Sequence, residues 1–85
     1  MSDWVAVRIK LFGAFQEIAG SGEFERRLAA GSSIDDLWRK LAADWPGLSE
    51  RDPVRLSSVN LDFADGDRIL NAGDEVAFFP PVSGG

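Results

Sequence analysis

The sequence predicts one α+β domain in which a single mixed β-sheet curls over one main helix. Alternating apolar and polar residues predict strands near both ends of the chain, and one central segment has helical spacing. With 85 residues, 45% of them hydrophobic, the chain can bury one core and has no room for a second. We expect this domain to span residues 1–81, and a flexible tail to follow at residues 82–85.

The first strand is predicted at residues 4–11, because every second side chain there is apolar. These side chains are Val5, Val7, Ile9 and Leu11. Gly13 then breaks the alternation, and residues 14–18 are expected to form a short helical turn.

A second strand is predicted at residues 23–29, after the chain reverses at Gly20-Ser21-Gly22. Phe24 and Leu28 share one face of this strand. Arg26 lies on the same face and would turn a charge inward, so we expect the strand at an edge of the sheet.

The one clear helix is predicted at residues 34–45, with a serine cap in Ser32-Ser33 and with Asp35 and Asp36 in its first turn. Its apolar stripe consists of Ile34, Leu37, Trp38, Leu41, Ala42 and Trp45. Because the tryptophans occupy stripe positions, they are interpreted as core residues and not as a ligand platform. Pro46 ends the helix, since the residue before a proline is disfavoured in helical geometry.

Residues 50–53 are polar and turn-like, and residues 54–63 have strand character. In residues 54–63 the alternation of apolar and polar residues changes register at Ser57-Ser58. We therefore expect one strand with a bulge at that point.

Two turns are predicted at residues 65–67 and 71–74, which are rich in Asp, Asn and Gly. Their spaced aspartates lack the twelve-residue spacing and terminal Glu of a calcium loop, so turns are the better interpretation. The last strand is predicted at residues 75–79 and ends at Pro80-Pro81. A hairpin, a helix and further strands that cover the helix stripe give the β-grasp architecture.

The residue types that are missing argue against a side-chain active site. The chain has no His, Cys or Tyr, so the usual general acid–base and thiolate chemistry is absent, as are disulfides and thiolate metal sites. We expect no bound metal. Fourteen acidic against nine basic residues, without a basic stripe, argue against nucleic acid and anionic membranes as partners. No leader and no run of about 20 apolar residues is present, so a cytoplasmic location is expected.

The chain ends in Val82-Ser83-Gly84-Gly85. Since glycine makes up about 7% of residues, a terminal Gly-Gly occurs by chance in about one chain in two hundred. After a final strand and a stiff diproline the signal is stronger, because a slender tail can enter a narrow channel and present an unhindered carboxylate. A free carboxylate is a poor acyl donor, so another enzyme must activate it, normally by adenylation.

At this point the sequence resembles a known family. The ending GDEVAFFPPVSGG, residues 73–85, is similar to that of the small, sulfur-carrying subunit of molybdopterin synthase. The opening IKLFG at residues 9–13, then Glu17 and Gly20, resembles the same family, and Val59-Asn60 lies where the family commonly has Val-Asn. The resemblance implies a ubiquitin-like fold and a sulfur carrier.

The resemblance also implies a reaction cycle. An E1-like activating enzyme would use ATP to adenylate Gly85, and a sulfur donor protein would replace the adenylate to leave a thiocarboxylate. The tail would then enter the large subunit of the synthase and give its sulfur to a pyranopterin precursor. This chain would be a non-catalytic subunit that binds no cofactor itself, and Gly85 would be the residue that changes covalently.

An exposed aromatic face is expected beside the tail. If Phe78 is in the core, Phe79 points outward, and Phe12 lies on the outer phase of the first strand. Phe63 joins them if its phase is outward. The predicted partner-binding residues are Phe12, Phe63, Phe79, Pro80, Pro81, Val82, Ser83 and Gly84.

Three alternatives remain open. Sulfur carriers for thiamine, cysteine or transfer-RNA thiolation also end in Gly-Gly. A ubiquitin-like modifier would join the same carboxylate to lysines of target proteins. A plain interaction module would have an inert tail.

Overall fold

The computed structural model describes residues 3–51 and 55–80, and the side chains at 50 and 51 are outside this description. Its elements follow the chain in this order: β1 (Trp4–Leu11), α1 (Ala14–Ala19), β2 (Glu23–Ala29), α2 (Ile34–Asp44), α3 (Gly47–Arg51), β3 (Leu56–Val59), β4 (Asp62–Phe63) and β5 (Glu75–Phe79).

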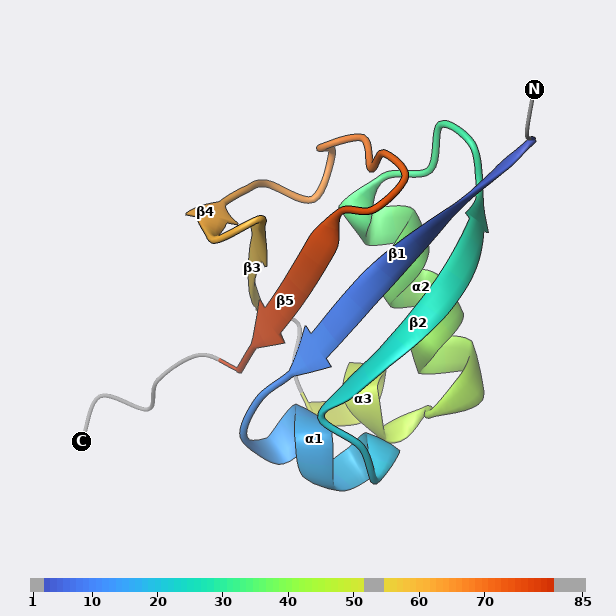
Figure 1. Cartoon of the computed structure of the whole chain (residues 1–85). Helices are drawn as coiled ribbons and strands as arrows, with labels where there is room; N and C mark the ends of the chain where they lie inside the picture. The colour runs from blue at the N-terminus through green and yellow to red at the C-terminus, as the bar shows by residue number, and fades with distance from the viewer. Residues whose placement is uncertain (1–2, 52–54, 81–85) are drawn as a thin grey trace.

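The five strands form one sheet in the order β2-β1-β5-β3-β4. β1 and β5 are parallel, and the other neighbours are antiparallel. Figure 1 shows α2 packed across one face of this sheet, with α1 and α3 near one end of it. The prediction of a mixed β-grasp sheet over one main helix is confirmed.

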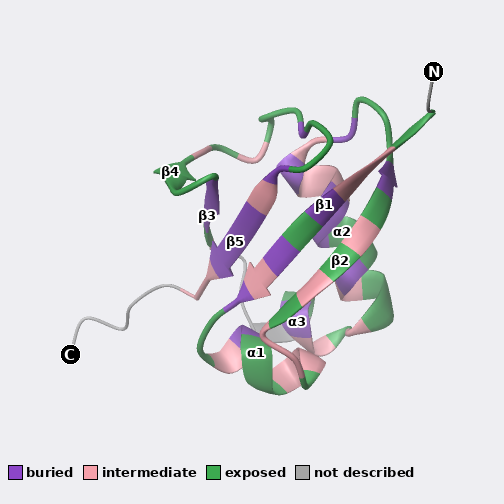
Figure 2. Ribbon diagram, viewed as in Figure 1, coloured by how far each residue is buried: buried purple, intermediate pink, exposed green. Residues whose placement is uncertain are grey.

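β1 supplies the centre of the core through its alternation (Figure 2). Its inward side chains Val7, Ile9 and Leu11 are each at most 1% exposed. Full burial of such an aliphatic side chain contributes roughly 1.5–3 kcal/mol. The predicted bounds of the strand are confirmed.

β2 lies at the edge of the sheet, as its inward arginine predicted. The guanidinium carbon of Arg26 lies 5.6 Å from the ring centroid of Phe24 and 5.3 Å from that of Trp45. One guanidinium nitrogen also pairs with Asp44 at 2.6 Å. The half-buried guanidinium therefore lies over two aromatic rings and pairs with a carboxylate.

α2 begins with a serine cap, as predicted, and Ser33 is the serine that forms it. Ser33 Oγ accepts from the Asp36 N–H at 3.1 Å, and the Asp36 carboxylate accepts from the Ser33 N–H at 2.9 Å, which completes a capping box. The helix ends at Asp44, and Trp45 is its C-cap. The buried Trp38 packs edge-on against Phe15, with ring centroids 5.0 Å apart. The interpretation of the stripe tryptophans as core is confirmed for Trp38, while Trp45 packs half-buried beside the core.

A third helix, α3, occupies part of the segment predicted as a turn. Pro46 ends α2 as expected, but its carbonyl then accepts from both the Ser49 N–H and the Ser49 Oγ, each at 3.1 Å. The same proline thus stops one helix and starts another. Leu48 on α3 is fully buried in the core. Because α3 extends to Arg51, the prediction of a turn at residues 50–53 was wrong for residues 50 and 51. Residues 52 and 53 lie outside the described residues.

The single bulged strand predicted at residues 54–63 was also wrong. The chain forms a hairpin, in which β3 and β4 pair antiparallel around a turn at Asn60 and Leu61. Both turn residues have positive φ, 51° and 74°. Such turns are usually signalled by Asn-Gly, and leucine at the second position hides the signal. No bulge interrupts β3: Ser57 and Ser58 pair in register with β5, and Ser57 Oγ donates to the Ala64 carbonyl at 2.8 Å.

Asn60 ties this hairpin to the start of β5. Its side-chain N–H donates to Asp74 at 3.0 Å, and its side-chain oxygen accepts from the Glu75 N–H at 3.0 Å. The other Asp74 oxygen accepts from the Asn71 N–H at 2.7 Å. The predicted turn at 71–74 is confirmed, as is the one at 65–67, which the Arg68 N–H closes onto the Asp65 carbonyl.

Candidate functional site

The site predicted at the chain's end begins where β5 leaves the sheet. β5 lies between β1 and β3, so the chain departs from the middle of the sheet. Phe78 is fully buried and packs against Trp38, with ring centroids 4.9 Å apart. Phe79 points the other way and is half-buried. The predicted inward and outward orientations of these two rings are confirmed.

Phe79 stacks directly on Phe12. The two rings are nearly parallel, at 9°, with centroids 4.7 Å apart. Because β1 and β5 run parallel as neighbours, the residue after β1 meets the last residue of β5. The Phe12 N–H also donates to the Phe78 carbonyl at 3.3 Å. Phe12 remains 41% exposed, so the pair presents an aromatic surface to solvent.

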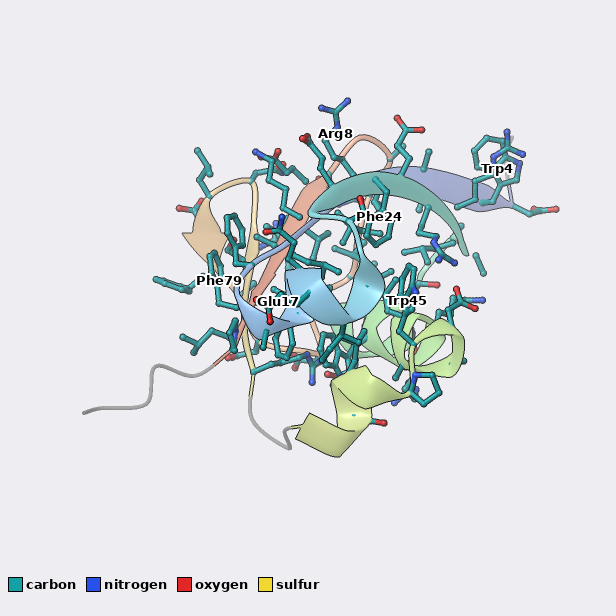
Figure 3. The ribbon with its side chains drawn as sticks, turned by 90° about the horizontal axis from the view of Figure 1, so that it is seen from below. Trp4, Arg8, Glu17, Phe24, Trp45 and Phe79 are labelled. Atoms are coloured by element: carbon teal, nitrogen blue, oxygen red, sulfur yellow. The ribbon has the colours of Figure 1, made fainter. Side chains whose placement is uncertain are left out.

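Two further apolar side chains continue this surface across β3 and β4. Leu56 pairs opposite Phe79 and is 44% exposed, and Phe63 on β4 is 78% exposed. We name Phe12, Phe79, Leu56 and Phe63 the apolar row. Figure 3 shows Phe79 on the opposite side of the molecule from Trp4 and Trp45. Sequence reasoning found the three phenylalanines and missed Leu56. Leu56 lies three residues before Val59 in the same strand, so the two side chains point to opposite faces of the sheet. This phase could have predicted an outward Leu56, but the assumed bulge obscured it.

Pro80 is the last residue of the predicted site that the structure describes. It is half-buried and packs against Gly13. The other predicted tail positions, Pro81, Val82, Ser83, Gly84 and Gly85, lie outside the described residues.

Polar groups border the apolar row on two sides. Lys10 Nζ and the Glu75 carboxylate pair at 3.1 Å on the outer face of β1 and β5. On the other side, Leu56 and Phe63 share a pocket of about 480 Å³ with Asp35 and Arg55. The Arg55 guanidinium contacts the Asp35 carboxylate and lies over the Trp38 ring, 4.9 Å from its centroid. Both charged groups are therefore engaged within the fold.

The described part of the chain shows no cluster of three or more His, Cys, Asp or Glu residues that could hold a metal ion. Within residues 3–51 and 55–80, no helix has the length and apolarity needed to cross a membrane. What the described residues of the site offer is a surface for binding and a fixed point of departure for the tail.

Comparison with known proteins gives consistent matches over nearly the whole chain. The model of the ThiS family matches residues 9–85. A molybdopterin synthase sulfur carrier subunit from Dictyostelium discoideum is 36% identical over 81 residues, covering 92% of this chain and 94% of that protein.

Solved structures agree on the fold. SAMP1 from Haloferax volcanii has a TM-score of 0.82 at 30% identity and covers 94% of this chain and 99% of its own. A chain in the complex of subunits 1 and 2 of molybdopterin-converting factor from Helicobacter pylori 26695 has a TM-score of 0.67 at 24% identity, covering 95% of this chain and 100% of its own. At that identity the likeness concerns the fold alone.

Proposed function

The chain belongs to the ThiS family, and from this premise we propose that it is a sulfur carrier subunit of molybdopterin synthase. The relative from Dictyostelium carries that name and matches almost end to end. The observation that supports the proposal most directly is the Phe12–Phe79 stack, an exposed aromatic surface at the point where the chain leaves the sheet toward Gly84-Gly85.

The chemistry that we propose is confined to the Gly85 carboxylate. An activating enzyme joins this carboxylate to the adenylyl group of ATP, and pyrophosphate leaves. A sulfide equivalent from a sulfur donor protein then attacks the acyl carbon, AMP leaves, and a thiocarboxylate remains. In the synthase the thiocarboxylate sulfur attacks an electrophilic carbon of the cyclic pyranopterin precursor, a carbon–sulfur bond forms, and a carbon–oxygen bond at that carbon breaks, its oxygen leaving as hydroxide that is protonated to water. Water finally cleaves the acyl–sulfur bond and restores the carboxylate.

The proposed partner for this last step is the large subunit of the synthase. A sulfur carrier subunit requires a companion, and the neighbour from Helicobacter pylori is a complex of subunits 1 and 2. The apolar row is the surface that we assign to this contact, because exposed aromatic clusters are preferred anchors in protein interfaces. The tail residues Pro80, Pro81, Val82, Ser83 and Gly84 would extend from it into the partner.

We propose further that this subunit is not itself a catalyst and binds no cofactor, with ATP used by the activating enzyme. The sequence has no His or Cys, which supports placing the catalytic groups in the large subunit. A cytoplasmic location, shared with those partner enzymes, belongs to the same proposal.

A ubiquitin-like modifier is the second candidate. It is favoured by the match to SAMP1, whose kind is named small archaeal modifier protein. Adenylation at Gly85 would begin identically in both cases. The candidates differ in the product, which is a thiocarboxylate for a carrier and an isopeptide bond to a lysine for a modifier.

Mass spectrometry of the C-terminal tryptic peptide tests the proposal. The protein is incubated with an activating enzyme, ATP and a sulfur donor, and the peptide spanning residues 69–85 is analysed. This peptide contains no Met, Trp or Cys, so replacement of oxygen by sulfur cannot be confused with side-chain oxidation. We expect the mass gain to map to Gly85.

An unmodified peptide, under conditions in which a known carrier reacts, would exclude the carrier function. A branched peptide on a target lysine in place of the thiocarboxylate would support the modifier. A variant lacking Gly84 and Gly85 is the matched control and should gain no mass.

A further inference from the structure

We propose that contact between Gly13 and Pro80 fixes the position of Pro80, the residue from which the tail starts, and that this position sets the rate of sulfur transfer. Gly13 would thus be a positioning residue for a reaction at the other end of the tail. The inference rests on the proposed sulfur-carrier function, and the experiment below separates the failure of one from the failure of the other.

The Gly13 backbone adopts a conformation that other residues avoid. Its φ is 57° and its ψ is −134°, which lies outside the regions open to residues with a Cβ atom. Its carbonyl accepts from the N–H groups of Gln16 and Glu17 at 3.1 and 3.3 Å, so this peptide group is held by the first turn of α1. Gly13 is therefore a rigid point next to the end of β1.

The missing side chain of Gly13 provides the space that Pro80 occupies. A Cβ atom built on Gly13 would lie 3.1 Å from Pro80 Cγ and 3.6 Å from Pro80 Cδ. The first distance is tighter than an ordinary van der Waals contact, so any other residue at 13 would push the proline ring away. Glycine here lets the ring lie directly on the backbone of the β1–α1 connection.

Pro80 is also fixed from its other side. The residue before it, Phe79, is stacked on Phe12, and the Phe12 N–H donates to the Phe78 carbonyl. The pyrrolidine ring holds the φ of Pro80 near −65°. With its ring seated on Gly13 and its own φ restricted, Pro80 has little freedom to move relative to the sheet.

The position of Pro80 matters because the tail is short. Five residues, from Pro81 to Gly85, span at most roughly 17 Å when extended. A displacement of Pro80 therefore takes away part of the short reach within which the reacting carboxylate must arrive. Misplacement of a reacting group by about 1 Å can reduce a rate by up to about 100-fold. A fixed position of Pro80 keeps this reach constant when the two subunits dock.

Two variants and two matched controls test the inference. Gly13→Ala introduces the clash and Pro80→Ala removes the ring, while Gly20→Ala and Pro46→Ala make the same changes without the contact. Gly20 also has positive φ, 75°, and also flanks α1, but a Cβ there meets nothing within 4 Å. Pro46 is exposed.

Each protein is charged as the thiocarboxylate and mixed with excess large subunit and precursor, and single-turnover sulfur transfer is measured. We expect Gly13→Ala and Pro80→Ala to slow transfer about tenfold at saturating large subunit, with a change in Kd of less than about threefold. Gly20→Ala and Pro46→Ala should stay within about twofold of wild type. A slower step at unchanged affinity is an effect that simple loss of folded protein does not produce.

The double variant Gly13→Ala/Pro80→Ala shows whether both residues act through one contact. We expect it to be no slower than the worse single variant, because the second change has nothing left to break. If Gly13→Ala does not fold, Pro80→Ala carries the test, since removing the half-buried ring introduces no clash. A nuclear Overhauser effect between Gly13 Hα and the Pro80 ring protons is expected in the wild type.

If Pro80→Ala transfers sulfur at the wild-type rate, or if that Overhauser effect is absent, the positioning role is excluded while the carrier function stands. If the wild type itself cannot be charged with sulfur, the carrier function fails, and with it the rate dependence claimed for Gly13.

Discussion

At the scale of single residues, the orientation of a side chain followed from strand phase alone. Phe78 and Phe79 are adjacent in one strand, so a buried Phe78 requires an outward Phe79, and the structure has them so. The role of Asn60 could not be predicted in this way. Its hydrogen bonds to Asp74 and Glu75 join segments 14 and 15 residues apart, and no local pattern announces such a contact.

The outward Phe79 gives the first prediction. Phe79→Asp should raise the Kd for the large subunit at least about tenfold, because a carboxylate would have to be desolvated in the centre of the apolar row. Isothermal titration calorimetry measures this. The thermal midpoint should change little, since the Phe79 side chain is only half-buried.

Ile69→Asp is the matched control. Ile69 is 49% exposed and lies outside the apolar row, so its loss should leave the Kd unchanged. Equal weakening by both variants would point to general charge repulsion from a chain of net charge −5 and would remove the apolar row from the interface.

At the scale of elements, local signals succeeded where one residue type governs the geometry. Ser33 and the following acidic turn predicted the start of α2, and the structure completes the capping box. The wrong predictions arose where one residue had two structural roles, or where a residue other than the one typical of a turn occupied that position. Pro46 starts α3 as well as ending α2, and Leu61 replaces the glycine expected in a tight turn. Element boundaries therefore failed where tertiary contacts, here the burial of Leu48, outweighed local preference.

The capping box predicts a dependence of stability on pH. The Ser33 N–H, and then the Arg39 side chain, hold the pKa of the Asp36 carboxyl below its ordinary value of 3.8. A carboxyl with a lowered pKa in the folded state stabilises the fold above its unfolded pKa, and this stabilisation is lost as the pH falls through the folded pKa. Wild type should therefore be more stable than Asp36→Asn at neutral pH.

That difference in unfolding free energy, measured by urea denaturation, should shrink as the pH is lowered below about 3.8. Asp67→Asn changes an exposed carboxylate in a turn, and its unfolding free energy should equal that of the wild type at every pH measured. A difference between wild type and Asp36→Asn that stays constant down to strongly acid pH would mean that the ionised carboxylate does not stabilise the helix start.

At the scale of the whole molecule, the fold places its first and last strands side by side. The parallel pairing of β1 with β5 brings Phe12 beside Phe79 and Gly13 beside Pro80. Periodicity predicted the strands and the helix, but strand order depends on contacts between distant parts of the chain, which no window of sequence contains. For that reason the three phenylalanines of the apolar row could be named from the sequence, whereas Leu56 and the contact between Gly13 and Pro80 emerged only from the structure.

The same arrangement predicts that the folded domain and the reactive tail can be separated. The core cluster is built from residues no later than Phe78, so deletion of residues 82–85 should leave the thermal midpoint within about 1 °C of the full chain. The deletion should also abolish sulfur charging, because the proposed acceptor carboxylate is gone. Phe78→Ala is the contrasting variant and should cost about 3–5 kcal/mol of unfolding free energy, since it empties a fully buried site.

Differential scanning calorimetry and mass spectrometry on the same samples separate these two effects. A truncated chain that is destabilised like Phe78→Ala would make the tail part of the folded domain, and the boundary at residue 81 would move. A truncated chain that still gains sulfur would place the acceptor elsewhere than Gly85. A truncated chain that keeps its thermal stability but cannot be charged with sulfur is the expected result. It is the result required if the folded domain presents the tail and the chemistry takes place at Gly85.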